Sequence, residues 1–471
     1  MSGVWGALSL DGQDLVEATY LGLRALQSRG EDGTGLALAG DHTSITTWTA
    51  EATVDRLMER TLFDNLRRMK PNIIIGHTRR KRGLEPEPLQ PLNLEFGRYN
   101  LSIGANGAIV RYEDLIVAGP SLLTEAEIVG TIFGRSLQRS DDLWVAGQET
   151  MEALSGRGSY CAILVVDDGE KKSLIALRDP KGIKPLCLGK REQTYFIASE
   201  TTALPDDGEF LGFIKPGEMV IVSEDGLERR QLRPEPQTLC VFEYIYYASG
   251  GSDLEHGNVF DVRRRDGLEL AKLYPIEVDA AVPIPDSGRG VSVGIAEGLG
   301  VPYIEGLERV KGALRTYMIA DPEDRVRAVR SKFKPISVML RDKRVAVGED
   351  SIVKGSITRY GAIHKLKEGG ATEVYLMVSC PPYAYVCFRD FRRPERLAAQ
   401  GLSERDIDEV NQIVAERIGA DHVRYQTRER LLKVIGSQDL CMACLDGRYP
   451  IKKQFLPEGY ESSIDQEKLF H

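Results

Sequence analysis

The pattern of apolar residues changes once along this chain, and this change restricts the folds that it can adopt. Before residue 232, short runs rich in Val, Ile and Leu are bounded by Gly, Asp or Pro, as half-buried β-strands are. Beyond residue 237, apolar runs alternate with helical patterns, which is typical of a parallel α/β sheet with crossover helices. The segment between them, Leu-Arg-Pro-Glu-Pro-Gln, contains two prolines and indicates a linker. We therefore predict an α/β protein with two domains, residues 1–235 and 236–471.

Single elements can be predicted in the first half. Strands are expected at 72–77, 101–110, 161–168, 173–180, 194–200 and 218–226. A helix is expected over 14–30, because Leu15, Val16 and Leu23 lie near one helical stripe and Gly30 is a suitable end.

Composition excludes several classes of protein. The 471 residues include 61 Lys and Arg against 70 Asp and Glu, a formal net charge of −9. An acidic balance argues against a general nucleic-acid binder, because phosphate backbones require surplus positive charge. No apolar run reaches the roughly 18 residues that cross a bilayer, and the N-terminal residues lack the charged and apolar regions of a secretory signal. We therefore expect a cytoplasmic protein without nucleic-acid or membrane partners.

Two loops of the second half have the character of phosphate-binding loops. In 343–358 an apolar strand ends in Glu349 and Asp350, and a loop with glycine and hydroxyl side chains leads into a helix. Backbone N–H groups at such a helix start bind anions, and the two carboxylates suit sugar hydroxyls or Mg²⁺. A second loop, 285–290, follows another strand. Either loop alone is equally compatible with an acidic N-cap and an ordinary turn, whereas the two together favour phosphate binding at the carboxyl edge of a parallel sheet.

These loops belong to a series of motifs that resembles one family over nearly the whole chain. The motifs of the second half are FEYIYYA (242–248), VPIPDSGRG (282–290), GVPYIEGL (300–307), the acidic pair with SIVKGSIT (349–358), and CMACLDGRYP (441–450). Those of the first half are GVWGALS (3–9), LQSRGEDGTG (26–35), GHTRR (76–80), ANG (105–107), RDPKGIKPL (178–186), ASETTAL (198–204) and KPGE (215–218). In this order they resemble the glutamine phosphoribosylpyrophosphate (PRPP) amidotransferases. The resemblance implies an N-terminal αββα glutaminase domain of the Ntn-hydrolase type, a type I phosphoribosyltransferase domain, and a homo-oligomer, commonly a tetramer.

For the transferase half, the resemblance implies a PRPP site that includes Mg²⁺, held by Glu349 and Asp350. The residues implied to bind PRPP are Asp286, Ser287, Arg315, Glu349, Asp350, Ser351, Lys354, Gly355, Ser356 and Thr358. The sequence departs from the family at several of these places. Glu349 replaces an aspartate, Gly348 a branched apolar residue and Ile357 a threonine, and residues 309–312 differ from the Lys-Asn-Arg-Tyr run of a catalytic loop.

For the glutaminase half, the resemblance implies a nucleophile at residue 2 that is exposed when Met1 is removed. Here that residue is Ser2, whereas the family has a cysteine, and a serine hydroxyl is the poorer nucleophile near neutral pH. Asn106 and Gly107 match the oxyanion-hole pair, and Arg79 matches the arginine that holds the substrate carboxylate. The further matches and departures are Arg29 and Gly30, which agree; Glu125, which replaces the aspartate that binds the substrate amino group; Ala105, which replaces a histidine; and Arg80, Lys81 and Arg82, which add positive charge in what we interpret as a solvated loop.

Seven cysteines in this chain are too few and too unevenly spaced for a disulfide framework. By spacing alone, Cys441 and Cys444 form a C-x-x-C pair that is compatible with redox chemistry, metal binding or burial. The resemblance implies that they join Cys240 and Cys387 as the four ligands of a [4Fe–4S] cluster with a structural role, and four thiolates suit such a cluster. Core packing is the default interpretation for the other three, Cys161, Cys187 and Cys380.

Three functional hypotheses follow. The first is a working amidophosphoribosyltransferase, which transfers the amide nitrogen of glutamine, or ammonia, to C1 of PRPP and gives 5-phosphoribosylamine for purine biosynthesis. The second is a divergent relative with a silent glutaminase half, which uses free ammonia or another nucleophile on PRPP or a related sugar phosphate. The third is a non-catalytic regulatory protein with the same fold. Ser2 favours the last two, whereas Arg79, Asn106 and Asp350 favour ligand binding.

Overall fold

A computed structural model describes residues 2–40, 43–81, 88–116, 123–310, 322–391, 397–458 and 460. Of the residues singled out above, Met1, Arg82, Lys311, Gly312 and Arg315 lie outside the described residues. The chain divides into two compact units. The first comprises Met1–Glu243, Tyr247–Glu255 and Pro450–Leu456, and the second comprises Tyr244–Tyr246, His256–Tyr449 and Pro457–His471. The expected linker at 232–237 thus belongs to the first unit.

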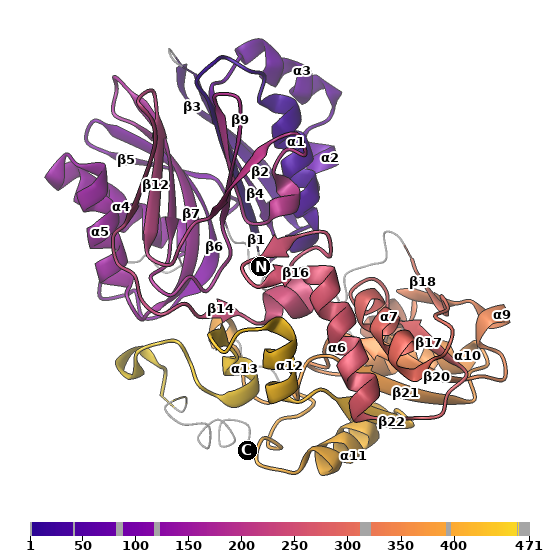
Figure 1. Ribbon diagram of the computed structural model, residues 1–471. Coiled ribbons are helices and arrows are strands. Elements are labelled where there is room, and N and C mark those ends of the chain that lie inside the picture. The colour runs from indigo at the N-terminus through magenta and orange to yellow at the C-terminus, as the bar shows by residue number, and fades with distance from the viewer. Residues whose placement is uncertain are drawn as a thin grey trace. The chain divides into compact units, whose positions relative to one another are not determined.

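The first unit is a sandwich of two antiparallel sheets (Figure 1). One sheet has the order β11(Glu209–Phe213), β9(Cys187–Arg191), β10(Thr194–Ala198), β1(Ser2–Ser9), β4(Ile73–Arg79), β2(Gly33–Gly40), β3(Thr43–Ala50). The other has the order β13(Gly226–Gln231), β12(Glu218–Ser223), β8(Lys172–Arg178), β7(Gly158–Asp167), β6(Tyr99–Ile109), β5(Leu92–Phe96). The six predicted strands are confirmed as β4, β6, β7, β8, β10 and β12.

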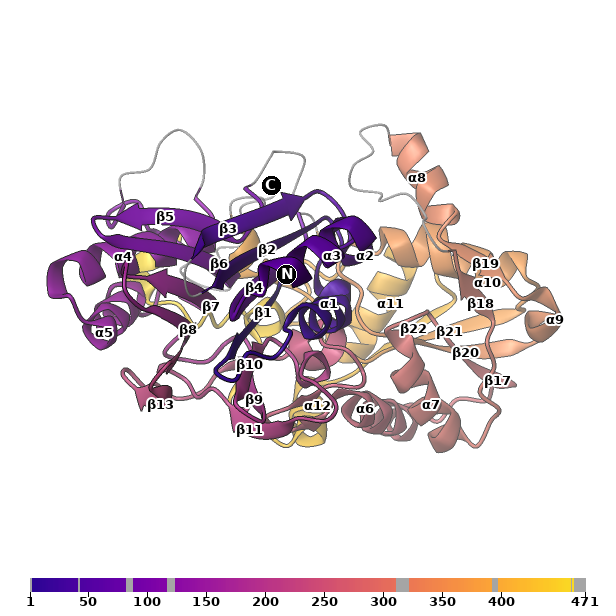
Figure 2. The same ribbon diagram turned by 90° about the horizontal axis from the view of Figure 1, so that it is seen from above.

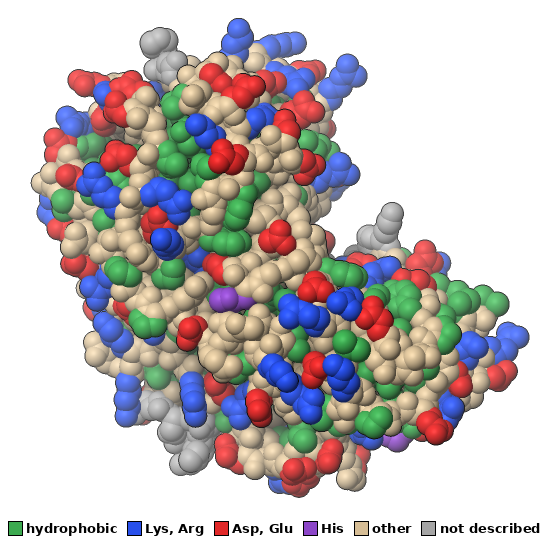
Figure 3. Space-filling view, viewed as in Figure 1, with side chains coloured by type: hydrophobic (Ala, Val, Ile, Leu, Met, Phe, Trp, Pro, Cys, Tyr) green, Lys and Arg blue, Asp and Glu red, His purple; other side chains and the backbone are tan. Residues whose placement is uncertain are grey.

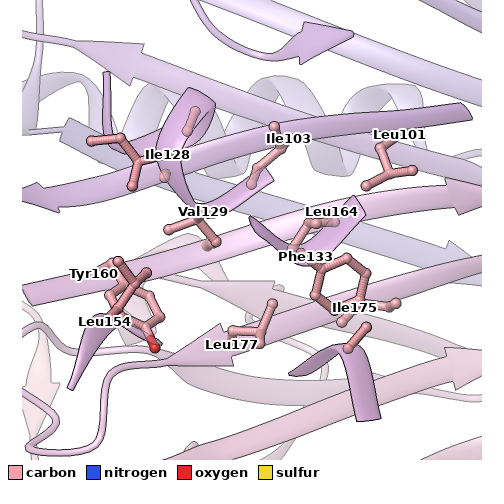
Figure 4. Close-up of a cluster of buried hydrophobic side chains, with 14 of the residues drawn as sticks. Leu101, Ile103, Ile128, Val129, Phe133, Leu154, Tyr160, Leu164, Ile175 and Leu177 are labelled. Carbon is pink, nitrogen blue, oxygen red and sulfur yellow. The ribbon is translucent and has the colours of Figure 1, made fainter. Parts of the chain in front are cut away.

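Helices cover the outer face of each sheet, so that the layers run helix, sheet, sheet, helix (Figure 2). The helices α1(Val16–Ala25), α2(Val54–Leu57) and α3(Arg60–Met69) cover the sheet that contains β1. The helices α4(Glu125–Ser140) and α5(Leu143–Leu154) cover the other, where Ile128, Val129 and Phe133 of α4 pack on the strands (Figure 4). A third apolar layer, which includes Val4, Ile75 and Ile163, fills the space between the sheets.

The predicted helix at 14–30 is confirmed in its core and ends earlier as an α-helix. The α-helical part is α1, which tightens to a 3-10 turn over Leu26–Arg29 and ends at the extended Gly30. Two glycines allow close packing at this end of the unit. A Cβ at Gly22 of α1 would lie 2.2 Å from the indole nitrogen of Trp5, and one at Gly30 would lie 2.3 Å from a backbone atom of Arg79. Side chains at either position would push α1 and its following turn away from the sheet.

The second unit is built on a four-stranded parallel sheet, as the alternation of strands and helices predicts. Its order is β17(Ala280–Pro283), β20(Arg344–Glu349), β21(Glu373–Val378), β22(His422–Tyr425). The helices α6(Val259–Leu273) and α7(Gly288–Leu299) pack on each other, α7 packs on β17 and β20, and α11(Ile407–Ile418) packs on β22. A short antiparallel pair, β18(Leu307–Arg309) and β19(Phe333–Pro335), lies outside this sheet.

The surface agrees with a mixed, mildly acidic composition. On the face that Figure 3 shows, acidic and basic side chains are interspersed. Among the described helices, none has the length and apolar character that crossing a bilayer requires.

Candidate functional site

The first candidate site gathers around Ser2, at the start of the central strand β1. Ser2 lies opposite Arg79 in the ladder between β1 and β4. Its backbone N–H donates to Oδ1 of Asn106 over 3.2 Å, and its carbonyl accepts from Nε of Arg29 over 3.2 Å. Two side chains from distant elements therefore hold the backbone of residue 2, and the structure brings Ser2, Arg79 and Asn106 together.

The side-chain amide of Asn106 presents a buried hydrogen-bond donor that is available to a ligand. It lies in β6 with 2% of its surface exposed, and while Oδ1 binds Ser2, its Nδ2 has no hydrogen-bond partner among the described residues. A buried donor without a partner costs free energy, so such groups often mark functional positions. The next residue must be glycine, because a Cβ at Gly107 would lie 2.0 Å from the carbonyl oxygen of Ser159 in β7.

Arg29 anchors this site through a buried ion network that sequence reasoning missed. Its guanidinium contacts Oε1 of Glu200 over 2.5 Å and Oε2 of Glu243 over 2.8 Å, and all three side chains are fully buried. Lys184 donates to the other oxygen of Glu243 over 3.2 Å. Burial by itself would raise the pKa of Glu243, but the charges of Arg29 and Lys184 outweigh it, and the pKa is lowered. Glu200 and Glu243 lie within two of the motifs quoted above, but their sequence gave no sign of a shared partner.

The residues expected to bind glutamine are both nearly buried in the first unit. Arg79 is the last residue of β4, and Glu125 is the first residue of α4, whose N-cap Thr124 forms a capping box with Glu127. A buried cation and a buried anion are the groups that an α-amino acid requires for its carboxylate and amino group. Beyond Arg79, the backbone N–H of Lys81 donates to Asp32 over 3.0 Å.

The side chain of Lys81 pairs with Glu51 over 2.6 Å. This part of the basic run is therefore neutralised by acidic neighbours rather than directed as free charge at a substrate.

The second candidate site lies at the carboxyl edge of the parallel sheet, within the second unit. The ends of β17 and β20 are neighbours in register, so the two predicted loops leave the sheet side by side. Ser287, from the loop after β17, donates to Oδ2 of Asp350, and Ser351 donates to Oδ1 of the same carboxylate over 2.6 Å. The loops come close because both are glycine-rich: a Cβ at Gly288 would lie 2.3 Å from the carbonyl oxygen of Gly348.

The acidic pair, Glu349 and Asp350, is buried, and burial raises the pKa of both carboxyl groups. Burial raises the pKa of Glu349 well above its ordinary value, and the adjacent charge of Asp350 raises it further. Burial also raises the pKa of Asp350, although hydrogen bonds from Ser287 and Ser351 act in the opposite direction. A divalent cation would relieve this repulsion, and Mg²⁺ is commonly held by one or two carboxylates together with substrate phosphates. The pair therefore fits Mg²⁺.

The remaining described residues predicted to bind PRPP lie in the two loops at this edge. Thr358 is buried at the start of a π-helical turn, Thr358–Ile363, and bonds Glu349. Gly355 has φ of +77°, a conformation that favours glycine. The other two loop positions, Lys354 and Ser356, are exposed and half-buried. Asp286 pairs with Arg309 over 3.0 Å at the surface.

One departure from the family has a direct structural reason. A Cβ at Gly348 would lie 2.2 Å from Oγ of Ser292, which belongs to α7 and donates to the carbonyl oxygen of Val282. Ser292 thus fills the space in which a branched side chain at position 348 would lie.

The cysteines divide by burial as expected only in part. Cys161, Cys187 and Cys380 are fully buried, as predicted for core residues, and burial raises the pKa of each thiol. Cys441, the last residue of β23(Leu440–Cys441), and Cys444, in α13(Ala443–Asp446), are also buried, whereas Cys240 and Cys387 are half-buried. Among the described residues, no three His, Cys, Asp or Glu side chains are arranged to hold a metal ion. The four thiols suit an iron–sulfur cluster by their chemistry, and the cluster stays a prediction.

An αββα sandwich with residue 2 beside Asn106, followed by a parallel α/β unit with a carboxylate pair at its edge, defines a class of protein. It is a two-domain enzyme type in which an amidotransferase domain precedes a phosphoribosyltransferase domain. Residues 77–206 match the family model described as a glutamine amidotransferase domain.

Known proteins resemble the chain over nearly its full length. It is 32% identical to the amidophosphoribosyltransferase of Methanocaldococcus jannaschii over 97% of this chain and 98% of that protein. It is 33% identical to the amidophosphoribosyltransferase of Pyrococcus horikoshii, over 95% of this chain and 96% of that protein. One similar solved structure is the glutamine PRPP amidotransferase of B. subtilis in complex with ADP and GMP. It is 29% identical with a TM-score of 0.80, and the match covers 95% of this chain and 97% of that one. This chain belongs to the amidophosphoribosyltransferase family.

Proposed function

We propose that this protein is an amidophosphoribosyltransferase: it transfers the amide nitrogen of glutamine to C1 of PRPP and gives 5-phosphoribosylamine for purine biosynthesis. The observation that carries the proposal is the presence of both half-sites in one chain that is about 30% identical to such enzymes from end to end. The test is consumption of PRPP by the purified protein with glutamine, and separately with an ammonium salt.

In the glutaminase half, Ser2 is the nucleophile once Met1 has been removed. Its Oγ attacks the amide carbon of glutamine, and its own α-amine accepts the hydroxyl proton. Nδ2 of Asn106 and the backbone N–H of Gly107 stabilise the oxyanion that forms. The C–N bond then breaks, ammonia leaves with that proton, and water hydrolyses the resulting ester to glutamate. Arg79 and Glu125 hold the carboxylate and amino group of the substrate.

In the transferase half, the loop 351–358 binds the 5′-phosphate, and Glu349 and Asp350 accept hydrogen bonds from the ribose hydroxyls. The backbone N–H groups of this loop and the hydroxyl of Ser356 are the anion donors, and the hydroxyls of Ser351 and Thr358 join them by turning from Asp350 and Glu349 to the phosphate. Mg²⁺, when bound with these carboxylates, neutralises charge on the diphosphate. Ammonia attacks C1, the C1–O bond breaks, pyrophosphate leaves, and one proton goes to solvent.

A second function is favoured by one observation, the serine at residue 2. A hydroxyl is a weaker nucleophile than a thiolate. In this second function the glutaminase half therefore does not hydrolyse glutamine, and free ammonia from solution is the nitrogen source. Turnover with ammonium but not with glutamine in the unmodified protein supports the second function, and turnover with both supports the first. Calorimetry that detects no PRPP binding in the presence of Mg²⁺ contradicts both and leaves a non-catalytic regulatory role.

We further propose that Cys240, Cys387, Cys441 and Cys444 bind a [4Fe–4S] cluster with a structural role. The thiolate chemistry of the four cysteines and the C-x-x-C spacing of Cys441 and Cys444 support this proposal. Iron and sulfide analysis of anaerobically purified protein tests it. Cys441→Ser is expected to lose iron, whereas Cys380→Ser, at a buried cysteine outside the proposed set, keeps it. Iron-free, fully folded wild-type protein contradicts the proposal.

The assembly of the chain is also a proposal. We expect a homo-oligomer, a tetramer by family resemblance. Light scattering of the purified protein tests this expectation, and a monomer at micromolar concentration contradicts it.

A further inference from the structure

Strand β6 carries the oxyanion pair, Asn106 and Gly107, and its pairing with β5 stops at Ile103, before that pair. In the ladder between β5 and β6, Leu92 lies opposite Ile103 and is the first residue of β5. Two residues further along β6, no strand among the described residues lies beside the backbone of Ala105 on that edge. Side chains take the place of the strand: Oε1 of Gln90 accepts from the N–H of Ala105 over 2.7 Å, and Nε2 of His77 contacts its carbonyl oxygen over 3.2 Å.

Both side chains are fixed in place. Gln90 is 1% exposed and His77 is fully buried in β4. The backbone of Gln90 rests on β2, since a Cβ at Gly35 would lie 2.1 Å from the carbonyl oxygen of Gln90. A carbonyl oxygen only accepts hydrogen bonds, so the imidazole proton of His77 must be on Nε2. Burial, together with the charge of Arg79, lowers the pKa of His77 to about 3, which keeps the ring neutral in this role.

The position of Ala105 determines that of the oxyanion donors. Along a strand, the N–H groups of residues i and i+2 point to the same edge, so the N–H of Gly107 points to the edge on which Gln90 and His77 hold Ala105. Asn106 lies between the two, and its side chain bonds Ser2. Holding Ala105 at both its N–H and its carbonyl therefore fixes the stretch of β6 that carries both donors, the N–H of Gly107 and the side-chain amide of Asn106.

We propose that His77 and Gln90 are positioning residues for glutamine hydrolysis, which act by holding Ala105 and through it the donors of Asn106 and Gly107. The inference rests on the proposed glutaminase function of the first unit. His77 and Gln90 then help to stabilise the transition state and do not help to bind glutamine. Neither is among the groups that would hold the carboxylate or amino group of glutamine.

Near-isosteric variants test this role. His77→Met and Gln90→Met remove the polar atom and keep a long side chain, whereas His77→Gln retains a donor near the position of Nε2. We expect both methionine variants to lower kcat for glutamine hydrolysis by about 10–100-fold with KM for glutamine within about twofold, because small displacements of catalytic donors are costly. His77→Gln restores most of kcat, and ammonium-dependent turnover is unchanged in all three. Thr150→Val, which removes a buried hydroxyl that bonds within α5, is the matched control and leaves kcat unchanged.

A purely structural role predicts a different result. It would lower the melting temperature and both activities together, or raise KM and leave kcat unchanged, and either outcome overturns the inference. The same measurements are made in the Ser2→Cys background, so that a weak serine nucleophile does not hide the effect.

A second readout does not depend on catalysis and separates this inference from the proposed function. In a hydrogen-exchange measurement, we expect the amide of Ala105 to be protected in the wild type. We expect Gln90→Met to increase the exchange rate of this amide by about tenfold or more, together with that of neighbouring β6 amides. If neither wild type nor Ser2→Cys hydrolyses glutamine, the proposed glutaminase function fails, and this exchange result alone decides whether the two residues hold the strand. Unchanged exchange at Ala105 overturns the inference in either case.

Discussion

The two candidate sites are built on opposite principles. Around Ser2, the functional groups project from buried strands, and Arg29, Glu200 and Glu243 are held by one another in the core of the first unit. Around Asp350, the groups lie on loops at the edge of a sheet, where Ile357 is 43% exposed. The comparison teaches that one altered side chain at the first site disturbs its neighbours, whereas the second site accepts substitutions such as Ile357 with loss of single contacts.

The strongest test of the rigid site is the loss of its central cation. Arg29→Met leaves Glu200 and Glu243 buried without their arginine, and removing one partner of a buried ion pair costs about 3–5 kcal/mol. We expect the free energy of unfolding of the first unit to fall by that amount in denaturant titrations. Arg24→Met, at an exposed arginine in α1, is the control and should change it by less than about 0.5 kcal/mol. Equal effects of the two substitutions would show that the network does not stabilise the unit.

The second unit contains a buried carboxyl whose effect depends on pH. Asp266 in α6 accepts from Nε2 of Gln426 over 2.7 Å, and burial raises its pKa to about 7. An unfolded aspartate has a pKa of about 3.9, so the folded state binds more protons, and stability falls as pH rises from about 4 to about 7. Asp266→Asn should therefore increase the free energy of unfolding by about 2–4 kcal/mol at pH 8 and leave it unchanged at pH 4. A constant difference across this range would contradict the assigned pKa.

Much of this could be predicted from the sequence, and what could not has a common physical cause. Strand periodicity located β4, β6 and β7, and the acidic pair with its hydroxyl-rich loop located the second site, because these signals are local. Glu243 and Gln90 carried no such signal. Their roles depend on partners brought near by the fold, Arg29 at 214 residues' separation and Ala105 across a strand edge.

At the loop site, single charged contacts should have intermediate effects. Asp350→Asn removes a charge that we expect to face PRPP and Mg²⁺, and a lost charged hydrogen bond costs about 1.5–3 kcal/mol. We expect the Kd for PRPP to rise by about 10–100-fold with the melting temperature unchanged or raised, since the buried carboxylates repel each other. Calorimetry with and without Mg²⁺ measures both effects. Glu368→Gln, in the exposed part of α10(His364–Glu368), should leave the Kd unchanged.

The smallest effect is expected at the start of α4. Thr124→Ala removes the N-cap of the helix that carries Glu125, at a cost of about 1 kcal/mol. Because Glu125 is the first helical residue, we expect KM for glutamine to rise about twofold to tenfold with kcat little changed, which sets it apart from the variants of His77 and Gln90. Thr46→Ala, on the exposed strand β3, provides the control. A loss of kcat without a change in KM would show that α4 does not position the substrate.

The most direct test of the account is the nitrogen source of the transferase, measured as PRPP consumption by the wild type and by Ser2→Cys. With an ammonium salt, we expect equal rates for the two proteins, because residue 2 belongs only to the glutaminase site. With glutamine, we expect a measurable rate for the wild type and a rate at least about tenfold higher for Ser2→Cys, because the thiolate is the better nucleophile. Ammonium-dependent turnover in the absence of any glutamine-dependent turnover, in both proteins, would contradict it.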